Sequence, residues 1–435
     1  MKQILVYSSK RSNRLTYVLD WLLKEQLQMD YTLVHETQGL EKSGFLISYG
    51  NHTLPGALSI PDVQLLWDKG VTEHDIATGT WGLVPTLYDA SKSAFTLPFD
   101  LFSAIFFLLS RYEEYYTYTP DAHNRYPATQ SILYKMRCLQ RPLIDEWIQT
   151  LRELLRNQFG VHTPEPKFTY RPTYDIDIAY SYKYKGFVRT AGAQARDIWA
   201  RKKDVYKERW AVVLNQKQDP CDSHDWMRNQ HLNKEPRPLF FILAANKTTL
   251  YDKNILPTHP RMQQLITQIA TYADIALHPS YFSDNDETLS EEKETLEKIL
   301  QHPITVSRQH YIKLKLPDTY LRLMRCGISQ DHSMGYGTHF GFRAGTGNSF
   351  FWYSLNNEFA TPLRAHPFCF METTAMFNEK LSLNDSFDRL RSMTKILQRT
   401  GSHLNTVFHN FSLGSAPEWV WWKGKYKEFL GDLEK

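Results

Sequence analysis

Several features that would point to familiar classes of protein are missing from this 435-residue sequence. It has only four cysteines, Cys138, Cys221, Cys326 and Cys369, which lie far apart and form no C-x-x-C pair. Neither a zinc ribbon nor a disulfide framework is therefore indicated, and a reducing compartment is the simpler expectation. The glycine-rich passage at 341–347 continues into neither G-x-G-x-x-G nor G-K-[ST], which argues against a dinucleotide or phosphate loop.

Long apolar runs and an excess of one charge are missing as well. The longest mostly apolar run, 102–109, is far shorter than the roughly 18 to 20 residues of a bilayer-spanning helix. Residues 1–9 contain too short an apolar stretch for a signal peptide and read as a β-strand. Lys and Arg number 51 against 47 Asp and Glu, and the two signs are interleaved. We therefore expect a cytoplasmic protein without a membrane span or a nucleic-acid partner, and the oligomeric state stays open.

The composition is that of a globular protein large enough for two or three domains. Hydrophobic residues make up 42% of the chain and charged residues 23%, which excludes a disordered or low-complexity chain. Aromatic residues reach 14%. This abundance suits the stacking of carbohydrate rings, but it suits an ordinary bulky core equally well.

The first third of the chain alternates strand-like and helix-like segments, which predicts a mixed α/β domain at 1–163. Short extended runs are expected at 3–7, 31–34 and 44–49, with helices at 15–27, 97–116 and 143–159. The last helix is expected to end at Gly160. The stiff segment Thr163-Pro-Glu-Pro-Lys167 then forms the best candidate for a domain boundary.

A second domain is expected at 168–435. Its apolar runs read as core strands at 168–178, 239–245, 274–278, 304–314, 341–345 and 405–411, several of them separated by helical segments. This pattern predicts a parallel α/β arrangement, of which a barrel is one form. Residues 183–237 are basic and weakly periodic, which is typical of a surface insertion.

The sharpest local feature is Thr173-Tyr-Asp175-Ile-Asp177. Side chains alternate between the faces of a strand, so Asp175 and Asp177 point the same way. Two carboxylates that share a small volume repel each other unless a cation or an arginine compensates, which suggests metal binding or acid/base chemistry. A pair of solvated carboxylates at a strand end is, from this motif alone, about as good an interpretation.

Other polar side chains stand at the ends of later strands. They are His278, Arg308 with His310 on the same side of an extended run, Arg343 in the glycine-rich passage, and His409. Each has an ordinary structural interpretation, such as a core histidine bonded to a carbonyl or a tight turn. Their order strengthens the functional interpretation, because the carboxyl ends of parallel strands gather at one face of an α/β barrel, where sites lie.

The segments TYDID, ALHPSY, GFRAGTG and VFHNFS, taken together, resemble the successive motifs of the metal-dependent polysaccharide deacetylases, the NodB-homology carbohydrate esterases. The resemblance extends from residue 168 to the C-terminus. The segment FDLFSAIFFLLSRYEEY is similar to one found in a branch with an extra N-terminal α/β region, which is often associated with bacterial surface-glycan biosynthesis. The fold that the resemblance implies is a distorted (β/α) barrel preceded by a smaller α/β domain.

The resemblance also implies roles for individual residues. Asp175 corresponds to the catalytic base, Asp177 to an acidic metal ligand and His278 to the first histidine ligand. Arg343 corresponds to the arginine that orients the base, and His409 to the general acid. The implied cofactor is a divalent metal ion, with zinc as the first expectation.

Two positions in this reading involve a departure or a substitution. The second histidine ligand normally lies four residues after the first, where this chain has Phe282. His310 is the candidate to replace it, followed by Asp331. Glu372 is the candidate for the acid that fixes the tautomer of His409, the histidine assigned as general acid.

The activity implied is that of a hydrolase acting on C–N bonds other than peptide bonds, which removes acetyl groups from N-acetylated sugars of a glycan or glycan precursor. A glycosyltransferase that binds a nucleotide sugar and a metal through its D-x-D pair is an alternative, but it leaves His278, Arg343 and His409 without roles. A non-catalytic glycan-binding protein is another, since the second histidine is missing. Hydrolysis of O-acetyl groups is a close variant of the same chemistry.

The N-terminal domain offers one polar cluster, which comprises Arg111, Glu113, Glu114, Asp121, His123 and Arg125. Contact with the substrate or with the mouth of the barrel is one interpretation. Charged clusters usually form ion pairs, so a domain interface is the first expectation, and we assign these residues no catalytic role.

Overall fold

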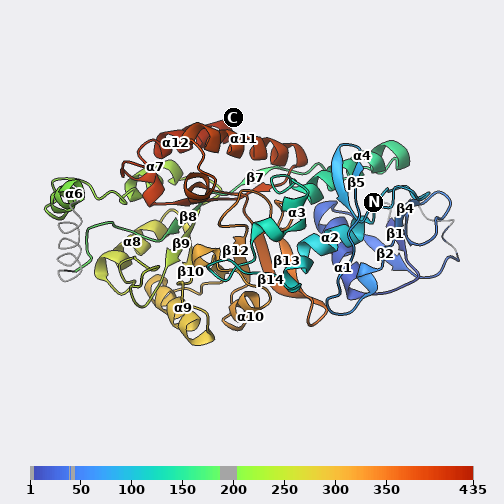
Figure 1. Cartoon of the computed structure of the whole chain (residues 1–435), viewed down its shortest axis with the longest axis horizontal. Helices are drawn as coiled ribbons and strands as arrows, with labels where there is room; N and C mark the ends of the chain where they lie inside the picture. The colour runs from blue at the N-terminus through green and yellow to red at the C-terminus, as the bar shows by residue number, and fades with distance from the viewer. Residues whose placement is uncertain (1–3, 39, 41–44, 187–202, 435) are drawn as a thin grey trace.

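A computed structural model describes residues 4–38, 40, 45–186 and 203–434, and Figure 1 shows an elongated molecule with the N-terminal strands at one end. Residues 187–202, within the expected insertion at 183–237, lie outside the described residues. A small sheet belongs to the first part of the chain, and a nine-stranded sheet belongs to the second.

The small sheet is parallel, with strand order β2-β1-β3-β4. Its strands are β1 (Ile4–Tyr7), β2 (Tyr31–Val34), β3 (Phe45–Gly50) and β4 (Leu58–Pro61). Between β1 and β2, α1 (Asn13–Leu19) runs on into a π-helical segment, Asp20–Gln26. These elements agree with the strands and the helix expected in this part of the sequence, because their alternating and helical apolar patterns are local.

The buried helix expected at 97–116 is shorter in the structure. It is α2 (Leu101–Leu109), and the side chain of Asp100 caps it by accepting a hydrogen bond from the Ser103 amide. Arg111 follows with a left-handed backbone, φ 55°, which ends the α-helix and starts a short 3₁₀ turn. The N-terminal part also contains β5 (Thr78–Trp81), β6 (Val84–Leu87), α3 (Ile132–Lys135) and α4 (Leu143–Phe159), and α4 ends at Gly160 as expected.

The large sheet has the order β13-β14-β12-β11-β10-β9-β8-β17-β15. Its strands are β8 (Thr173–Ile176), β9 (Leu239–Leu243), β10 (Asp274–His278), β11 (Val306–Ser307), β12 (Gln330–Met334), β13 (Phe350–Ser354), β14 (Phe359–Pro367), β15 (Phe370–Met371) and β17 (Thr406–His409). Every neighbouring pair is parallel except the hairpin of β13 and β14. A short pair, β7 (Thr169–Tyr170) and β16 (His403–Leu404), lies before β8 and β17.

The chain joins the two ends of this sheet between β14 and β15. The Phe368 amide donates to the carbonyl of Met334 in β12, whereas the next amide, of Cys369, donates to the carbonyl of Asn405 before β17, both at 3.2 Å. Consecutive residues thus change partners from one side of the sheet to the other, and the sheet is curled into a distorted barrel that is not fully closed. The expected α/β fold, a distorted (β/α) barrel preceded by a smaller α/β domain, is confirmed.

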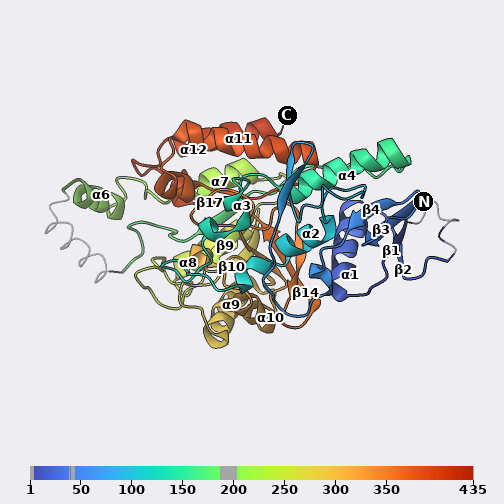
Figure 2. The same ribbon diagram turned by 45° about the vertical axis from the view of Figure 1, so that its right-hand side comes forward.

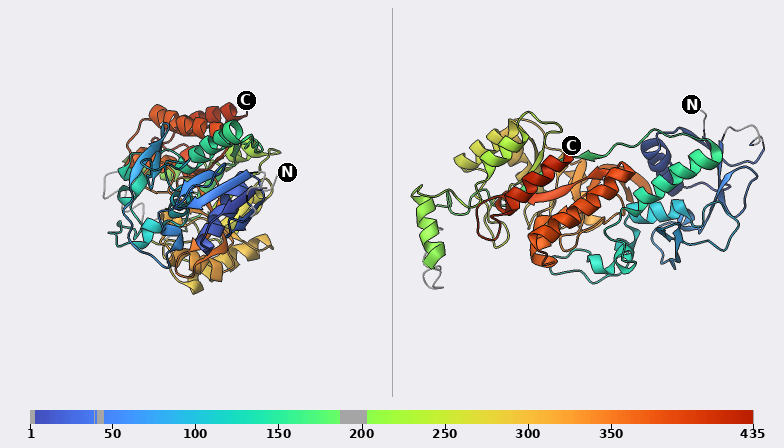
Figure 3. Two further views of the ribbon diagram at one scale, coloured as in Figure 1. Left: turned by 90° about the vertical axis from the view of Figure 1, so that its right-hand side faces the viewer. Right: turned by 90° about the horizontal axis from the view of Figure 1, so that it is seen from above.

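Helices cover the outside of the curled sheet. They are α7 (His224–His231), α8 (Pro260–Ala270), α9 (Asp286–Leu300), α10 (Asp318–Arg325), α11 (Leu383–Thr400) and α12 (Trp422–Leu433). α11 and α12 run along one edge of the molecule, and α9 and α10 lie at the opposite edge (Figures 1 and 2). α6 (Lys203–Val213) stands at the end farthest from the N-terminal sheet (Figure 3). None of the helices in the described ranges combines the length and apolarity that a bilayer crossing requires.

Two expected strands differ in the structure. Residues 341–345 form turns, in which Gly341 and Gly345 have φ of 129° and 68°. A Cβ on Gly341 would lie 2.1 Å from the carbonyl oxygen of Leu139, so this passage needs glycine because it packs closely against the N-terminal part. In the run 304–314, only the two residues of β11 pair as a strand.

Candidate metal centre and active site

The polar residues of the candidate site come from the carboxyl ends of parallel strands. Asp175 belongs to β8, and His278 and His409 are the last residues of β10 and β17. His310 lies three residues beyond the last residue of β11, and Asp177 follows β8 directly. The structure brings these five side chains together, and they line one cavity of about 340 Å³.

Three of them form a group that could hold a metal ion. One possible ligand atom from each of Asp177, His278 and His310 lies within 4.8 Å of the other two. Nε2 of His278 is 3.1 Å from Oδ1 of Asp177, and Nε2 of His310 is 3.4 Å from Oδ2 of the same carboxylate. Asp177 therefore lies between the two imidazoles.

The hydrogen bonds behind the two imidazoles fit them for metal binding. Nδ1 of His278 is 2.6 Å from the carbonyl oxygen of Arg308, which can only accept, so Nδ1 carries the proton. Nε2 then turns its lone pair towards Asp177, whose Oδ1 is buried without a hydrogen-bond partner among the described residues. A cation between these acceptors would remove their repulsion, and two imidazoles with a carboxylate are ligands typical of zinc. The residues therefore fit a divalent metal.

His310 has support of the same kind. Its Nδ1 lies 3.0 Å from Oδ1 of Asp252, a carboxylate that also accepts a hydrogen bond from the Tyr281 amide. A carboxylate behind a histidine fixes the orientation of the ring and strengthens it as a ligand. Burial lowers the pKa of His310, but the negative charges of Asp177 and Asp252 outweigh it and raise the pKa to about 9. The cavity therefore favours positive charge at this ring.

Asp177 is the electrostatic centre of the group. Burial acts to raise its pKa, but the charges of His310 and His409 outweigh it. The pKa of Asp177 is held well below its usual range. A carboxylate that stays ionised among histidines is suited to bind a cation.

Arg308 holds Asp175 in place. Its Nη1 donates to Oδ1 of Asp175 at 2.7 Å, its Nη2 donates to Thr173 at 2.8 Å, and its Nε donates to the carbonyl of His332 at 3.1 Å. The guanidinium is fully buried and lies 4.1 Å from the centre of the Phe241 ring. Oδ2 of Asp175 is 3.8 Å from Nε2 of His278, so this second oxygen lies beside the candidate metal group.

His409 is held by Glu372, the buried residue after β15. Nδ1 of His409 is 2.7 Å from Oε1 of Glu372, which also accepts a hydrogen bond from the His409 amide. Burial lowers the pKa of His409, but the charges of Glu372 and Asp177 outweigh it and raise the pKa to about 10. The imidazole is therefore protonated at neutral pH. Its Nε2 lies 3.4 Å from Oδ2 of Asp177.

Arg343 and Asp331 lie elsewhere. The Nε and Nη2 atoms of Arg343 donate to the carboxylate of Glu114 in the N-terminal domain, at 2.8 and 2.5 Å. The arginine beside Asp175 is Arg308, a correction to the sequence-based assignment. Asp331 accepts hydrogen bonds from Ser307 and Ser333 and does not line the cavity.

The N-terminal domain reaches the cavity, which the sequence analysis gave as the second interpretation of its polar cluster. His123 and Arg125 both line it. Nδ1 of His123 is 2.9 Å from the Tyr281 hydroxyl, and Nη1 of Arg125 donates to the carbonyl of Tyr311 at 2.5 Å. Tyr251 stacks on Tyr281 with ring centres 3.8 Å apart, so this wall of the cavity is aromatic. No local sequence pattern marks these contacts.

Comparisons with known proteins find one family match and several similar solved structures. Residues 4–160 match a family of unknown function, DUF7033. A search of curated proteins returns no match. Among solved structures, a protein from Mycobacterium smegmatis assigned to the polysaccharide deacetylases is 12% identical, with a TM-score of 0.39; the match covers 62% of this chain and 85% of that one.

Two further solved structures are similar. A polysaccharide deacetylase from Bacillus cereus is 9% identical with a TM-score of 0.30, over 62% of this chain and 89% of that one. The carbohydrate deacetylase Agd3 is 10% identical with a TM-score of 0.36, over 99% of this chain and 84% of that one. The structural neighbours are thus deacetylases, as the sequence motifs indicate. At these TM-scores the likeness does not identify an activity, which depends on the side chains of the cavity.

Proposed function

We propose that this protein is a metal-dependent hydrolase that removes acetyl groups from N-acetylated sugars of a glycan or glycan precursor. One observation carries the proposal: a single cavity contains a three-residue ligand group, a carboxylate held by an arginine and an imidazolium held by a glutamate. These are the parts that metal-assisted hydrolysis of an amide needs.

Asp177, His278 and His310 are the residues that would hold the metal, with zinc as the first expectation. When bound, such an ion polarises an acyl oxygen and lowers the pKa of water. Asp175 is the proposed base, and its Oδ2, which Arg308 does not bind, accepts the proton of the attacking water. Arg308 keeps this carboxylate in one orientation by binding the other oxygen, a role that the sequence analysis gave to Arg343.

His409 is the proposed general acid. Its Nδ1 proton stays on the hydrogen bond to Glu372, so Nε2 carries the proton that can be transferred. As the water oxygen bonds to the acyl carbon and the C–N bond breaks, Nε2 gives this proton to the departing nitrogen. The products are acetate and a free amino sugar. A pKa raised to about 10 keeps His409 in the protonated form that this step requires.

The aromatic wall of the cavity supports a sugar as the substrate. Tyr251 and Tyr311 line the cavity, with the Tyr311 ring next to that of His310, and Phe411 lines it with its ring stacked on His409. Flat aromatic faces bind the apolar faces of sugar rings, while the polar groups of the cavity bind hydroxyl and acyl oxygens.

The test is acetate release by the purified protein after metal analysis. N-acetylglucosamine oligomers and O-acetylated glycans are offered with zinc or cobalt, and then with a chelator. We expect acetate from the N-acetylated substrates, loss of activity with the chelator, and a large loss in Asp175→Asn. Asp284→Asn, a change to an exposed carboxylate outside the cavity, is the matched control and should keep activity.

Two outcomes would contradict the proposal. If metal-loaded protein releases no acetate from any substrate but still binds the oligomers, the glycan-binding alternative is favoured. If sugar transfer from a nucleotide sugar is found instead, the glycosyltransferase alternative is favoured. Acetate from O-acetylated substrates alone would retain the chemistry and change the substrate.

A further inference from the structure

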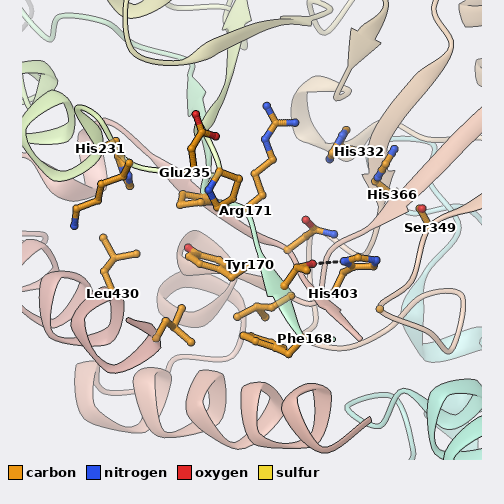
Figure 4. Close-up of a pocket in the computed structure, with 18 of the residues that line it drawn as sticks. Phe168, Tyr170, Arg171, His231, Glu235, His332, Ser349, His366, His403 and Leu430 are labelled. Atoms are coloured by element: carbon orange, nitrogen blue, oxygen red, sulfur yellow. Dashed lines mark hydrogen bonds between the residues drawn. The ribbon is translucent and has the colours of Figure 1, made fainter. Parts of the chain in front are cut away.

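A second cavity lies at the opposite end of the barrel, about 670 Å³ in volume (Figure 4). Its lining includes residues that come just before β8 and β17 and the first residue of β12, so it opens at the amino ends of the strands. It shares no lining residue with the catalytic cavity. The proposed reaction gives this cavity no role.

The lining is divided into an apolar side and a nitrogen-rich side. Phe168 and Leu430 lie on one side in Figure 4, and Leu404 and Leu433 add to the apolar lining. Arg171, His332 and His366 lie on the other side, with His403 hydrogen-bonded to Thr169 at its edge. A volume of this size is in the range of small-molecule sites, and a ligand that fits both sides must be amphipathic.

The nitrogen-rich side contains a pair of incompletely bonded histidines. His332 and His366 come from the adjacent strands β12 and β14, and their rings stack with centres 4.3 Å apart and an interplanar angle of 3°. Nδ1 of His332 and Nε2 of His366 are buried and have no hydrogen-bond partner among the described residues. His332 is only 4% exposed. Buried polar atoms of this kind are costly unless a ligand or water bonds them.

Two arginines, Arg171 and Arg364, bring positive charge near the histidine pair, and the carboxylates of Glu235 and Glu434 also line the cavity. Burial is the main cause that lowers the pKa of both imidazoles, and Arg364 and Arg171 add to the effect at His366, whose pKa falls to about 3. Arg171 lines the cavity itself, while its Nε and Nη2 donate to the Arg237 carbonyl and to Asp274. A neutral imidazole carries one N–H, so each ring can donate one hydrogen bond to an anion that lies beside the Arg171 guanidinium.

We propose that this second cavity binds an organic carboxylate with an apolar body. The acid group lies against the stacked pair of His332 and His366, next to Arg171, and the apolar body lies against the leucines and Phe168. The site is independent of the proposed deacetylase reaction, because it needs neither the metal nor Asp175.

Three probes with the same alkyl chain test the chemistry of the ligand. Octanoate, octanol and octyltrimethylammonium are titrated into the full chain at pH 7, with binding followed by ligand-observed NMR and calorimetry. Octanoate should bind saturably, octanol at least about tenfold more weakly because it lacks the charge, and the cation not at all. Equal binding of octanoate and octanol, or no saturable binding of octanoate, would overturn the proposal.

Two variants and a matched control test the location. Arg171→Gln and His366→Phe should each weaken octanoate binding at least about tenfold, since one removes charge and the other removes ring nitrogens while keeping an aromatic ring. Arg237→Gln is the control, because Arg237 also pairs with Asp274 but does not line the cavity. Its affinity should be unchanged. Thermal unfolding of each variant checks that the fold is retained.

A third variant separates this site from the catalytic cavity. Asp175→Asn should bind octanoate as well as the unmodified protein does. If octanoate binding falls in Asp175→Asn and is unchanged in Arg171→Gln, the carboxylate binds at the catalytic cavity and the proposal is wrong. Failure of the deacetylase assay would leave this titration unaffected.

Discussion

Arg308 and Arg343 are both fully buried, and each binds a carboxylate that lies far away in the sequence. Arg308 donates to Asp175 at 2.7 Å, and Arg343 donates to Glu114 at 2.5 Å. The acid of the first pair, Asp175, lines the cavity that contains the candidate metal group, whereas the second pair joins the two regions of the chain. Similar pairs thus hold a proposed base in one place and an interface in the other.

The oxygens of the two acids distinguish the pairs. Arg343 binds both oxygens of Glu114, and Arg111 donates to one of them as well. Asp175 uses one oxygen for Arg308, and the other lies near His278. A buried arginine–carboxylate pair indicates a catalytic acid or base only where one oxygen is left for the cavity. Resemblance alone could not separate Arg343 from Arg308 by this criterion.

The largest effect is expected for Asp175→Asn. Removing a general base costs about two to four powers of ten in rate, and the loss should appear in kcat for acetate release. The change also leaves the buried guanidinium of Arg308 without its charged partner, so the free energy of unfolding is measured beside kcat, and kcat is compared for folded protein. A variant with near-normal kcat would show that Asp175 is not the base.

Glu114→Gln should have the opposite profile. It leaves Arg343 and Arg111 without their charged partner in a buried interface, and breaking a buried pair costs about 3–5 kcal/mol of unfolding free energy. Urea unfolding measures this loss. The variant protein that remains folded and is loaded with metal should keep its kcat. A large fall in kcat under conditions where all of the variant is folded would contradict the comparison.

Arg125→Gln tests an arginine of the N-terminal domain that acts on the cavity. Arg125 binds the carbonyl of Tyr311, and Tyr311 and Ile312 have left-handed backbones with φ of 58° and 52° directly after His310. Loosening this turn should lower zinc affinity about tenfold, as for other residues that support ligands. Competition with a zinc chelator measures the affinity. Arg141→Gln, which removes an arginine bonded to Glu146 and not to the cavity, should leave it unchanged.

The smallest effect concerns pH. Burial acts to raise the pKa of Glu114, but Arg343 and Arg111 outweigh it and lower the pKa below its usual value of 4.5. A lowered pKa means that the pair stabilises the fold above about pH 4.5 and that this stability is lost as pH falls through the folded-state pKa. The difference in unfolding free energy between the unmodified protein and Glu114→Gln should therefore shrink below that pH. A difference that is constant from pH 7 to pH 3.5 would contradict the assignment.

The sequence predicted what depends on local pattern. Alternation along a strand placed Asp175 and Asp177 on one side, and the rule for parallel strand ends brought His278 and His409 to the same place. Arg343 was misassigned because its glycine-rich passage is a turn at the domain interface, where pairing with Glu114 depends on tertiary packing. His310 reaches the site through a turn of the backbone, and the conformational preferences of the residues in that turn do not predict it.

Features that depend on distant segments were beyond a single sequence. His123 and Arg125 were expected in an interface, and only the packing of the two regions brings them to the cavity. The second cavity combines segments around 168, 332, 366 and 430 that have no common motif. Local sequence patterns therefore identified the residues at the strand ends. The packing of distant segments determined which arginine binds Asp175 and which residues line the two cavities.

The position of Arg125 has a practical consequence for anyone who dissects this chain. A fragment that starts at the proline-containing link would keep every proposed ligand and both proposed proton-transfer groups. It would nevertheless lack Arg125, which binds the carbonyl of Tyr311, and Glu114, the acid that pairs with Arg343. Cutting between the two regions would thus disturb the proposed site, and the upstream segment is better regarded as a part of that site than as an appendage.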